Sequence, residues 1–175
     1  VGRFPHRPAL TVSGETLTYT QLYERAAALA AALARRAEAS PHAAGDRIVE
    51  AAPAAAGDAA GVATPEASAV SPPDATPGPA PPFTAVLASR SVTAYTGVLA
   101  ALLRGHGYVP LNPAFPPERT RTMLERSGAR ALIVDGRSEA QLDAVLSGLD
   151  RDLTILLPER DDVREWSSGW PRHVF

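Results

Sequence analysis

Apolar residues three or four positions apart recur in four stretches of this chain, and that spacing places them on one face of an α-helix. The first helix begins at a capping box, with Thr18 as the cap and Gln21 three residues later, and runs to Arg35-Arg36. The second begins at Ser91 and ends at Gly105. The side chains expected to face the core are Leu22, Ala26, Leu29 and Leu33 in the first helix, and Val92, Tyr95, Val98, Leu99, Leu102 and Leu103 in the second.

Two shorter helices follow. The third begins at Pro116-Pro117-Glu118, residues that a first helical turn favours, and ends at Gly128, which suits a left-handed C-cap. The fourth begins at a second capping box, formed by Ser138 and Gln141. Their expected core residues are Met123 and Leu124 in the third helix, and Leu142, Val145, Leu146 and Leu149 in the fourth.

Short apolar runs outside the helices predict strands. Residues 9–12 and 16–18 flank a turn at Gly14, while residues 108–111, 131–134 and 153–157 are buried strands that alternate with the helices. Uniformly apolar strands separated by single amphipathic helices need crossovers that cover both faces of a sheet. The pattern therefore predicts an α/β fold with a parallel sheet and right-handed crossovers, which by itself indicates no activity.

Residues 50–82 depart from this pattern. They are dominated by Ala and Pro and contain no aromatic residue, Leu, Ile or Arg. Such a segment buries too little apolar surface to offset its ordering entropy, so it is predicted to be a disordered insertion. Its flanks, residues 45–49 (GDRIV) and 85–90 (AVLASR), resemble the start and the continuation of a strand that adenylate-forming enzymes carry without a break, and this resemblance implies that the flanks form one strand. A linker between two domains is the alternative, although residues 1–49 are few and poor in strands for a domain.

Composition excludes several classes of function. The formal net charge of -2, with scattered basic residues, gives no surface for nucleic acid. There is no Cys, which excludes disulfides and thiolate chemistry, and no Lys, which excludes a P-loop lysine or a Schiff base. No stretch is long and apolar enough to cross a membrane, and no signal peptide follows Val1. We expect a soluble, cytoplasmic protein without a nucleic-acid or membrane partner.

Glycines and histidines offer no clear site. The segment Gly105-His106-Gly107 contains the glycines of an anion-binding loop, but it precedes a strand rather than a helix, so helix termination is the better interpretation. The histidines lack metal-ligand spacing, and we expect them at the surface or in loops. They are His6, His42, His106 and His173.

Acidic residues and serines near the strand ends have structural interpretations as well as functional ones. Glu159 with Asp161-Asp162 could hold a cation, although an acidic surface loop is more common. Ser89 and Ser91 follow a strand, where ligands of α/β proteins bind, but without nucleophile-elbow glycines or a nearby base they indicate a helix cap.

Trp166 and Trp170 lie four residues apart, with Pro171 next. We expect them to pack a terminal turn against a neighbour outside this chain.

Four blocks of sequence resemble one family, and they occur in that family's order. Residues 102–113, LLRGHGYVPLNP, resemble the LKAGxAYVPLDP motif of adenylate-forming enzymes, above all the amino-acid adenylation domains of nonribosomal peptide synthetases and the D-alanine-activating ligases. Residues 17–22, LTYTQL, are similar to LTYxEL; residues 115–119 and 123–129, FPPER and MLERSGA, resemble YPxER and MLEDSGA. The block at residues 102–113 departs from its motif at four positions, Leu103, Arg104, Gly107 and Asn112.

The resemblance implies that residues 1–175 are a partial N-terminal AMP-binding subdomain, interrupted by the insertion at 50–82. The full-length enzyme would use ATP and Mg to convert a small carboxylic acid, an amino acid by this resemblance, to an acyl-adenylate. It would then transfer the acyl group to a thiol, commonly the phosphopantetheine arm of a carrier protein.

The family's catalytic motifs are missing from this chain. They are a Ser/Thr/Gly-rich loop ending in Pro-Lys-Gly, a Tyr-Gly-x-Thr-Glu segment, an Asp that holds the ribose and a C-terminal catalytic Lys. We therefore assign no catalytic, cofactor-binding or metal-binding residue, and expect the chain to be inactive in isolation. The alternative is a non-catalytic α/β interaction or scaffold module derived from the same fold.

Overall fold

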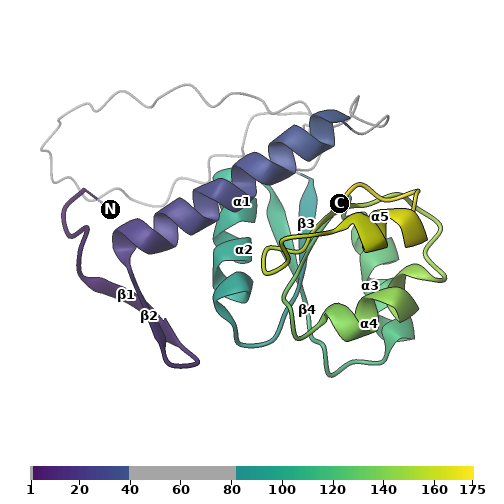
Figure 1. The fold of residues 1–175 in the computed structure, drawn as a ribbon, viewed down its shortest axis with the longest axis horizontal. Helices are drawn as coiled ribbons and strands as arrows, with labels where there is room; N and C mark the ends of the chain where they lie inside the picture. The colour runs from purple at the N-terminus through teal and green to yellow at the C-terminus, as the bar shows by residue number, and fades with distance from the viewer. Residues whose placement is uncertain (1, 40–81) are drawn as a thin grey trace, which may run out of the picture. The chain divides into compact units, whose positions relative to one another are not determined.

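Helices and strands alternate along the chain in the computed structural model, which describes residues 2–39 and 82–175 (Figure 1). The strands are β1 (Pro8–Val12), β2 (Glu15–Thr18), β3 (Phe83–Leu87), β4 (Gly107–Leu111), β5 (Ala131–Val134) and β6 (Thr154–Leu156). The helices are α1 (Tyr19–Ala39), α2 (Val92–Leu103), α3 (Pro117–Ser127), α4 (Glu139–Leu146) and α5 (Arg164–Gly169).

The main sheet has the strand order β4-β3-β5-β6, and every pair in it is parallel. The strands β3, β5 and β6 are buried almost throughout, as their apolar sequences predict. The chain runs from β3 to β4 on one side, then returns to β5 on the other side of β3. This confirms the predicted α/β class with a parallel sheet.

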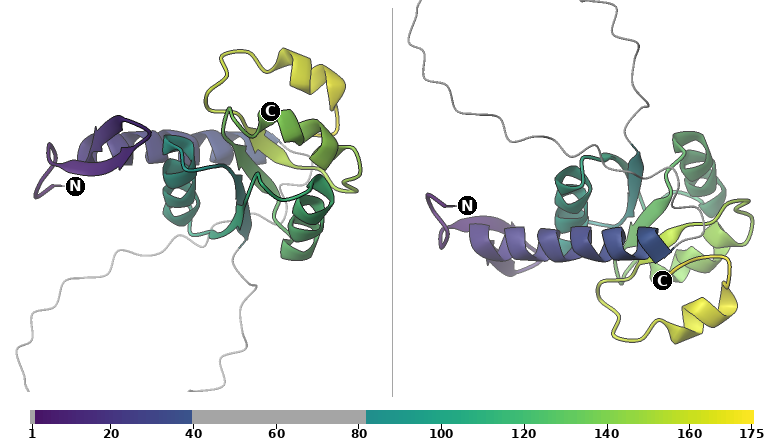
Figure 2. Two further views of the ribbon diagram at one scale, coloured as in Figure 1. Left: turned by 90° about the horizontal axis from the view of Figure 1, so that it is seen from below. Right: turned by 90° about the horizontal axis from the view of Figure 1, so that it is seen from above.

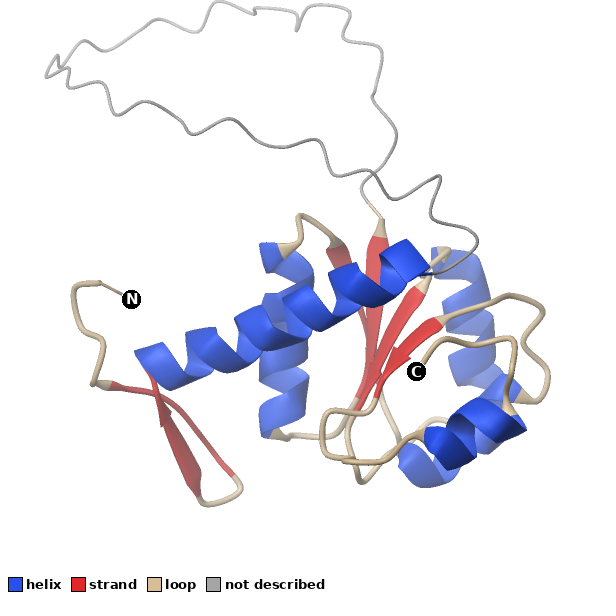
Figure 3. Ribbon diagram, turned by 45° about the horizontal axis from the view of Figure 1, so that its top comes forward, coloured by secondary structure: helices blue, strands red, loops and turns tan. Residues whose placement is uncertain are grey.

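Helices cover both faces of the sheet (Figures 2 and 3). On one face, Leu33 of α1 packs with Ile133 and Leu156. On the other, Leu124 of α3 and Leu142 of α4 join the larger cluster of buried apolar side chains. Successive residues of a strand point to opposite faces, so β5 and β6 each contribute side chains to both clusters.

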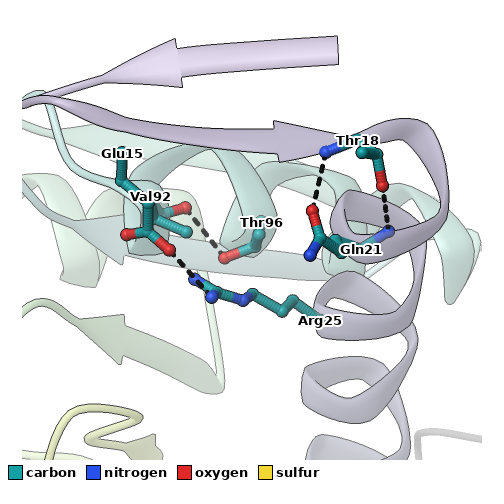
Figure 4. A network of polar contacts seen from close by, with 6 residues as sticks. All are labelled: Glu15, Thr18, Gln21, Arg25, Val92 and Thr96. Atoms are coloured by element: carbon teal, nitrogen blue, oxygen red, sulfur yellow. Dashed lines mark hydrogen bonds and ion pairs between the residues drawn. The ribbon is translucent and has the colours of Figure 1, made fainter. Parts of the chain in front are cut away.

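The N-terminal hairpin is joined to α1 by polar contacts that the sequence predicts (Figure 4). Gln21 Oε1 accepts from Thr18 N at 2.9 Å, and Thr18 Oγ1 accepts from Gln21 N at 3.3 Å, which is the predicted capping box. Ser13 and Gly14, at the turn between β1 and β2, both have positive φ, as the common two-residue hairpin turn requires.

The predicted core face of α2 is wrong. None of its large apolar side chains is buried, and Tyr95 and Leu102 are 44% and 53% exposed. The helix instead buries its small residues, Thr93, Thr96, Gly97, Ala100 and Ala101. The reason is close approach: a Cβ atom on Gly97 would lie 3.4 Å from side-chain carbons of both Val86 and Ile133. Larger side chains do not fit between α2 and the sheet.

The strand β4 is less buried than its sequence suggests, because it lies at the edge of the four-stranded sheet. Tyr108 is 44% exposed. Pro110 has no N–H to donate to a second neighbouring strand, which is why proline is confined to edge strands. Gly105 has the predicted positive φ of 69° that ends α2, whereas Gly107 is an ordinary strand residue.

The chain's last residues fold back on its own core, and this corrects the expectation for the two tryptophans. Trp166 and Trp170 pack against the main apolar cluster of this chain, not against a neighbour outside it. Trp166 also stacks on Phe175, and Trp170 Nε1 donates to Asp143 Oδ1 at 2.8 Å.

The predicted insertion at 50–82 and its first flank at 45–49 lie outside the described residues, except for Pro82. Pro82 is the residue before β3, and its carbonyl accepts a hydrogen bond from Gly107 N at 3.0 Å. Among the described helices, none has the length and apolar character that a membrane span requires.

Candidate functional site

Polar side chains gather where β3 and β5 end. These two strands are neighbours, but the connections that leave them run in opposite directions along the sheet. In open α/β sheets, such a switch point at the carboxyl ends of the strands is where ligands bind. The residues placed there are Ser89 after β3, Asp135 and Ser138 after β5, and Glu159 after β6.

Asp135 is the centre of this group. Its side chain is fully buried, and its Oδ2 accepts from both Ser89 N and Ser89 Oγ at 2.9 Å. Its Oδ1 accepts from Ser138 N at 2.9 Å and from Ser138 Oγ. Burial raises the pKa of Asp135, but the hydrogen bonds from Ser138 and Ser89 outweigh it and lower the pKa below the ordinary value of 3.8. The carboxylate is therefore ionised at neutral pH.

The same contacts replace the capping box predicted for α4. Ser138 makes no side-chain cap bond to the helix, because its hydroxyl donates to Asp135 instead. The side-chain amide of Gln141 donates to the carbonyl of Pro113, which ties α4 to the loop after β4. The pattern of a capping box is present in the sequence, but Ser138 bonds to Asp135 before the helix and Gln141 bonds to Pro113 in another loop.

Glu159 joins two elements that are far apart in the sequence, the helix α2 and the turn after β5. Its Oε1 accepts from Thr93 Oγ1 at 2.6 Å, and its Oε2 accepts from Gly136 N at 3.1 Å. It therefore links α2 to the turn after β5. Asp162, next to the exposed Asp161, pairs with Arg164 at 2.9 Å. The predicted acidic loop is thus a connector in which Glu159 has a definite structural role.

The polar residues at the switch point have little capacity for catalysis, because their side chains already hydrogen-bond to one another. Each oxygen of Asp135 already accepts two hydrogen bonds from its own chain, so it is not available as a general base. Ser91 is the N-cap of α2 and accepts from Ala94 N at 3.2 Å, which confirms the predicted cap. Ser89 is bonded to the carboxylate and has no histidine or other base beside it, among the described residues, that would activate a nucleophile.

The three described histidines lie at the surface or in loops, as expected, but two of them are buried. His6 is exposed, as predicted, but His106 and His173 are 6% and 7% exposed. His106 Nδ1 lies 3.0 Å from Thr84 Oγ1, and His173 Nδ1 accepts from Leu153 N at 3.1 Å. A neutral imidazole accepts one hydrogen bond and donates another, which makes it acceptable in a core. His42 lies outside the described residues.

Within the ranges 2–39 and 82–175, no three His, Asp or Glu side chains lie close enough to hold a metal ion. Of the glycines around His106, Gly105 follows the end of α2 with a positive φ, and Gly107 is the first residue of β4.

Sequence reasoning missed Asp135, although a signal for it existed. An aspartate directly after a fully apolar strand, with a serine three residues later, is placed at the carboxyl end of a sheet. The bond between Glu159 and Thr93 had no such signal, because 66 residues separate the two and neither belongs to a motif.

Comparison with known proteins identifies the family. A family model described as "AMP-binding enzyme" matches residues 80–172, which is more than half of the chain. The chain belongs to the AMP-binding enzyme family. Its resemblance to the adenylation domains of nonribosomal peptide synthetases is likewise confirmed, by the relatives that follow.

A plipastatin synthase of Bacillus subtilis is 30% identical over 165 residues, which is 93% of this chain and 5% of that protein. Tyrocidine synthase 3 of Brevibacillus parabrevis is 30% identical over 138 residues, 79% of this chain and 2% of that protein. This chain therefore spans only a small part of the synthases that it matches.

Solved structures agree on the fold. The Vibrio cholerae adenylation domain AlmE, in complex with glycyl-adenosine-5'-phosphate, matches 99% of this chain with a TM-score of 0.68 and 20% identity. The structure of IdnL7 matches 92% with a TM-score of 0.61 and 25% identity. The matched part is 25% of the AlmE chain and 24% of the IdnL7 chain.

Proposed function

We propose that this chain is the front part of an ATP-dependent ligase that activates a carboxylic acid, and that the acid is an amino acid. The ligase joins the acid's carboxylate to the α-phosphate of ATP, releases pyrophosphate and forms an acyl-adenylate. It then transfers the acyl group to a thiol, such as a carrier protein's phosphopantetheine arm. The observation that carries the proposal is the AMP-binding match over residues 80–172.

Two further observations support an amino acid and a carrier. The relatives with 30% identity are plipastatin and tyrocidine synthases, and the AlmE adenylation domain was solved with a glycyl adenylate. The adenylate would be formed by parts of the ligase that this chain does not contain, since its own carboxyl-edge residues are bonded to one another.

The surface of α2 also favours a longer ligase. This helix has no charged residue, and Tyr95, Leu102 and Leu103 are all exposed. Helices that are apolar on every side are normally covered by other parts of a protein. A further part of the ligase polypeptide would cover this one.

The proposal is tested first by the coding sequence that follows residue 175. It should encode a Ser/Thr/Gly-rich loop ending in Pro-Lys-Gly, and the longer polypeptide should catalyse pyrophosphate exchange into ATP that depends on one amino acid. Residues 1–175 alone are the control and should show no exchange. A coding sequence that continues without that loop would contradict the proposal that this chain is part of an ATP-dependent ligase.

A scaffold or interaction module without catalytic activity is the second candidate. It is favoured by the carboxylate of Asp135 at the switch point, since each of its oxygens already accepts two hydrogen bonds from this chain. A monomeric chain of residues 1–175 that unfolds cooperatively would support this module. Aggregation through exposed apolar surface would instead favour a part of a larger enzyme.

A further inference from the structure

The chain's last three residues extend the main sheet. After α5 the backbone returns to β6, where Val174 forms a parallel bridge with Thr154. Ile155 N donates to the carbonyl of Val174 at 2.7 Å, and Val174 N donates to the carbonyl of Leu153 at 3.0 Å. The edge of β6 is thus covered by a short segment of the same chain.

His173 adds a side-chain contact to this pairing. Its Nδ1 accepts a hydrogen bond from Leu153 N at 3.1 Å, and the residue is 7% exposed. Nδ1 can accept only while it carries no proton. Protonation would replace the acceptor with a second donor facing Leu153 N, in a place where water cannot easily solvate the charge.

The charged groups around His173 do not offset its burial. Burial lowers the pKa of His173 below 6.5, the Asp152 carboxylate raises it, and the Arg172 guanidinium lowers it again. Asp152 itself accepts from Arg172 Nε at 3.2 Å, and Asp150 lies 3.9 Å from the same guanidinium. On α4, Asp143 accepts from Trp170 Nε1. The carboxylates near the imidazole are therefore engaged with other partners.

Both tryptophans of the chain lie in this segment. The Trp166 and Phe175 rings stack with their centroids 6.2 Å apart, and the Trp170 and His173 rings are also 6.2 Å apart. Release of the segment would expose these rings together. The helix α5 is only six residues long, too short to persist without its packing.

We propose that residues 164–175 form a clasp on β6 that is closed while His173 is neutral and opens when His173 is protonated, with the rest of the sheet remaining folded. Local opening of this kind is expected for a short segment held by few backbone bonds. The lowered pKa means that the closing contribution is complete above pH 6.5 and is lost as pH falls from there through the lowered value.

The test follows tryptophan fluorescence of the whole 175-residue chain between pH 8 and pH 4, with far-UV circular dichroism measured on the same samples. The clasp predicts a red shift of emission with a midpoint below pH 6.5, while the helical signal is largely retained. In parallel, hydrogen exchange should speed up at Ile155 N relative to Leu132 N in the sheet interior as pH falls. Because the ratio is taken at each pH, the intrinsic pH dependence of exchange cancels.

Three variants assign the transition. His173→Asn places a non-titrating oxygen near the position of Nδ1 and should remove the red shift, while His6→Asn, at an exposed site, should leave it unchanged. Val174→Pro removes the N–H that bonds to Leu153 and should give the acid-like emission already at pH 8. A transition that persists in His173→Asn, or one in which emission and circular dichroism change together as a single unfolding, would overturn the clasp.

Discussion

The carboxylate of Asp135 accepts two hydrogen bonds from Ser89, both 2.9 Å long, although the two residues are 46 positions apart in the chain. The contact joins the turn after β3 to the turn after β5. Because Asp135 is buried and ionised, its carboxylate depends on these donors for the stabilisation that water would otherwise provide. The two turns are therefore held together by the charge.

Replacing this charge should destabilise the fold. Asp135→Asn keeps the shape but turns an NH₂ group toward serine donors, and we expect the free energy of unfolding to fall by about 2–4 kcal/mol. Urea denaturation at pH 7 measures it. Asp161→Asn, at an exposed site, is the control and should change stability by less than about 0.5 kcal/mol. An Asp135→Asn protein as stable as the parent would show that the bonds contribute nothing.

The same carboxylate should make stability depend on acid pH. The pKa of Asp135 is lower in the folded chain than its ordinary value of 3.8, so its contribution is complete above that value and is lost as pH falls through the folded pKa. The stability difference between the parent and Asp135→Asn should therefore be constant from pH 6 down to about pH 3.8 and shrink below that pH, as measured by urea unfolding at each pH. A difference that stayed constant below that pH as well would mean that Asp135 does not titrate in that range.

Neighbouring residues of α2 should respond in opposite ways to a change in size. Ala101 is fully buried, so Ala101→Leu should overpack the helix and cost about 1–3 kcal/mol. Leu102 is 53% exposed, so Leu102→Ala should cost less than about 1 kcal/mol. Thermal unfolding of both variants tests the observed orientation of α2. If Leu102→Ala were less stable than Ala101→Leu, the buried face of α2 would instead be the one that carries its large apolar residues.

Arg121 should stabilise the end of α4. Its Nε and Nη2 donate to the carbonyls of Val145 and Ala144 at 3.2 and 2.7 Å, which the last turn of a helix leaves without intrahelical partners. We expect Arg121→Ala to lower stability by about 1–2 kcal/mol and Arg121→Lys by less, since a lysine donates to fewer carbonyls at once. Denaturant titration compares them with Arg126→Ala at an exposed site of α3. Equal loss in all three variants would exclude a specific cap.

Residues 1–175 should not bind ATP. The chain has no lysine, and its glycine cluster lies at the C-terminal end of α2, where the helix dipole disfavours phosphate. Calorimetry with Mg-ATP should show no saturable binding up to millimolar concentration. Saturable binding would instead indicate a phosphate site built from arginine, and Arg90→Ala and Arg104→Ala would be the first variants to locate it.

The parts of the fold that sequence predicted are those with local causes. Pro117 and Gly128 delimit α3 because each acts on its own backbone, and the apolar run of β5 needs burial on both sides. The orientation of α2 has no local cause. Nearly every residue of that helix is apolar or small, so its sequence indicates no single face, and the sheet's close approach at Gly97 decides which face is buried.

The candidate site shows the same division. The cap at Ser91 was predictable because its partner, Ala94 N, lies three residues away. The buried state of His173 was not, because it depends on a contact with Leu153 that exists only once the chain's end has folded back.

The strand β4 lies at one edge of the sheet, and its residues decide whether a further strand can pair there. In a parallel strand alternate residues bond to opposite sides, and Gly107 N and the carbonyl of Leu111 are both directed at the β3 side. The outward residues are then Tyr108 and Pro110, and proline leaves that side with one N–H donor. A strand arriving there from another molecule would find too few donors to form a ladder. Among the described strands, pairing of another molecule with β4 is therefore disfavoured, and the opposite edge, at β6, is bridged by Val174 of the same chain.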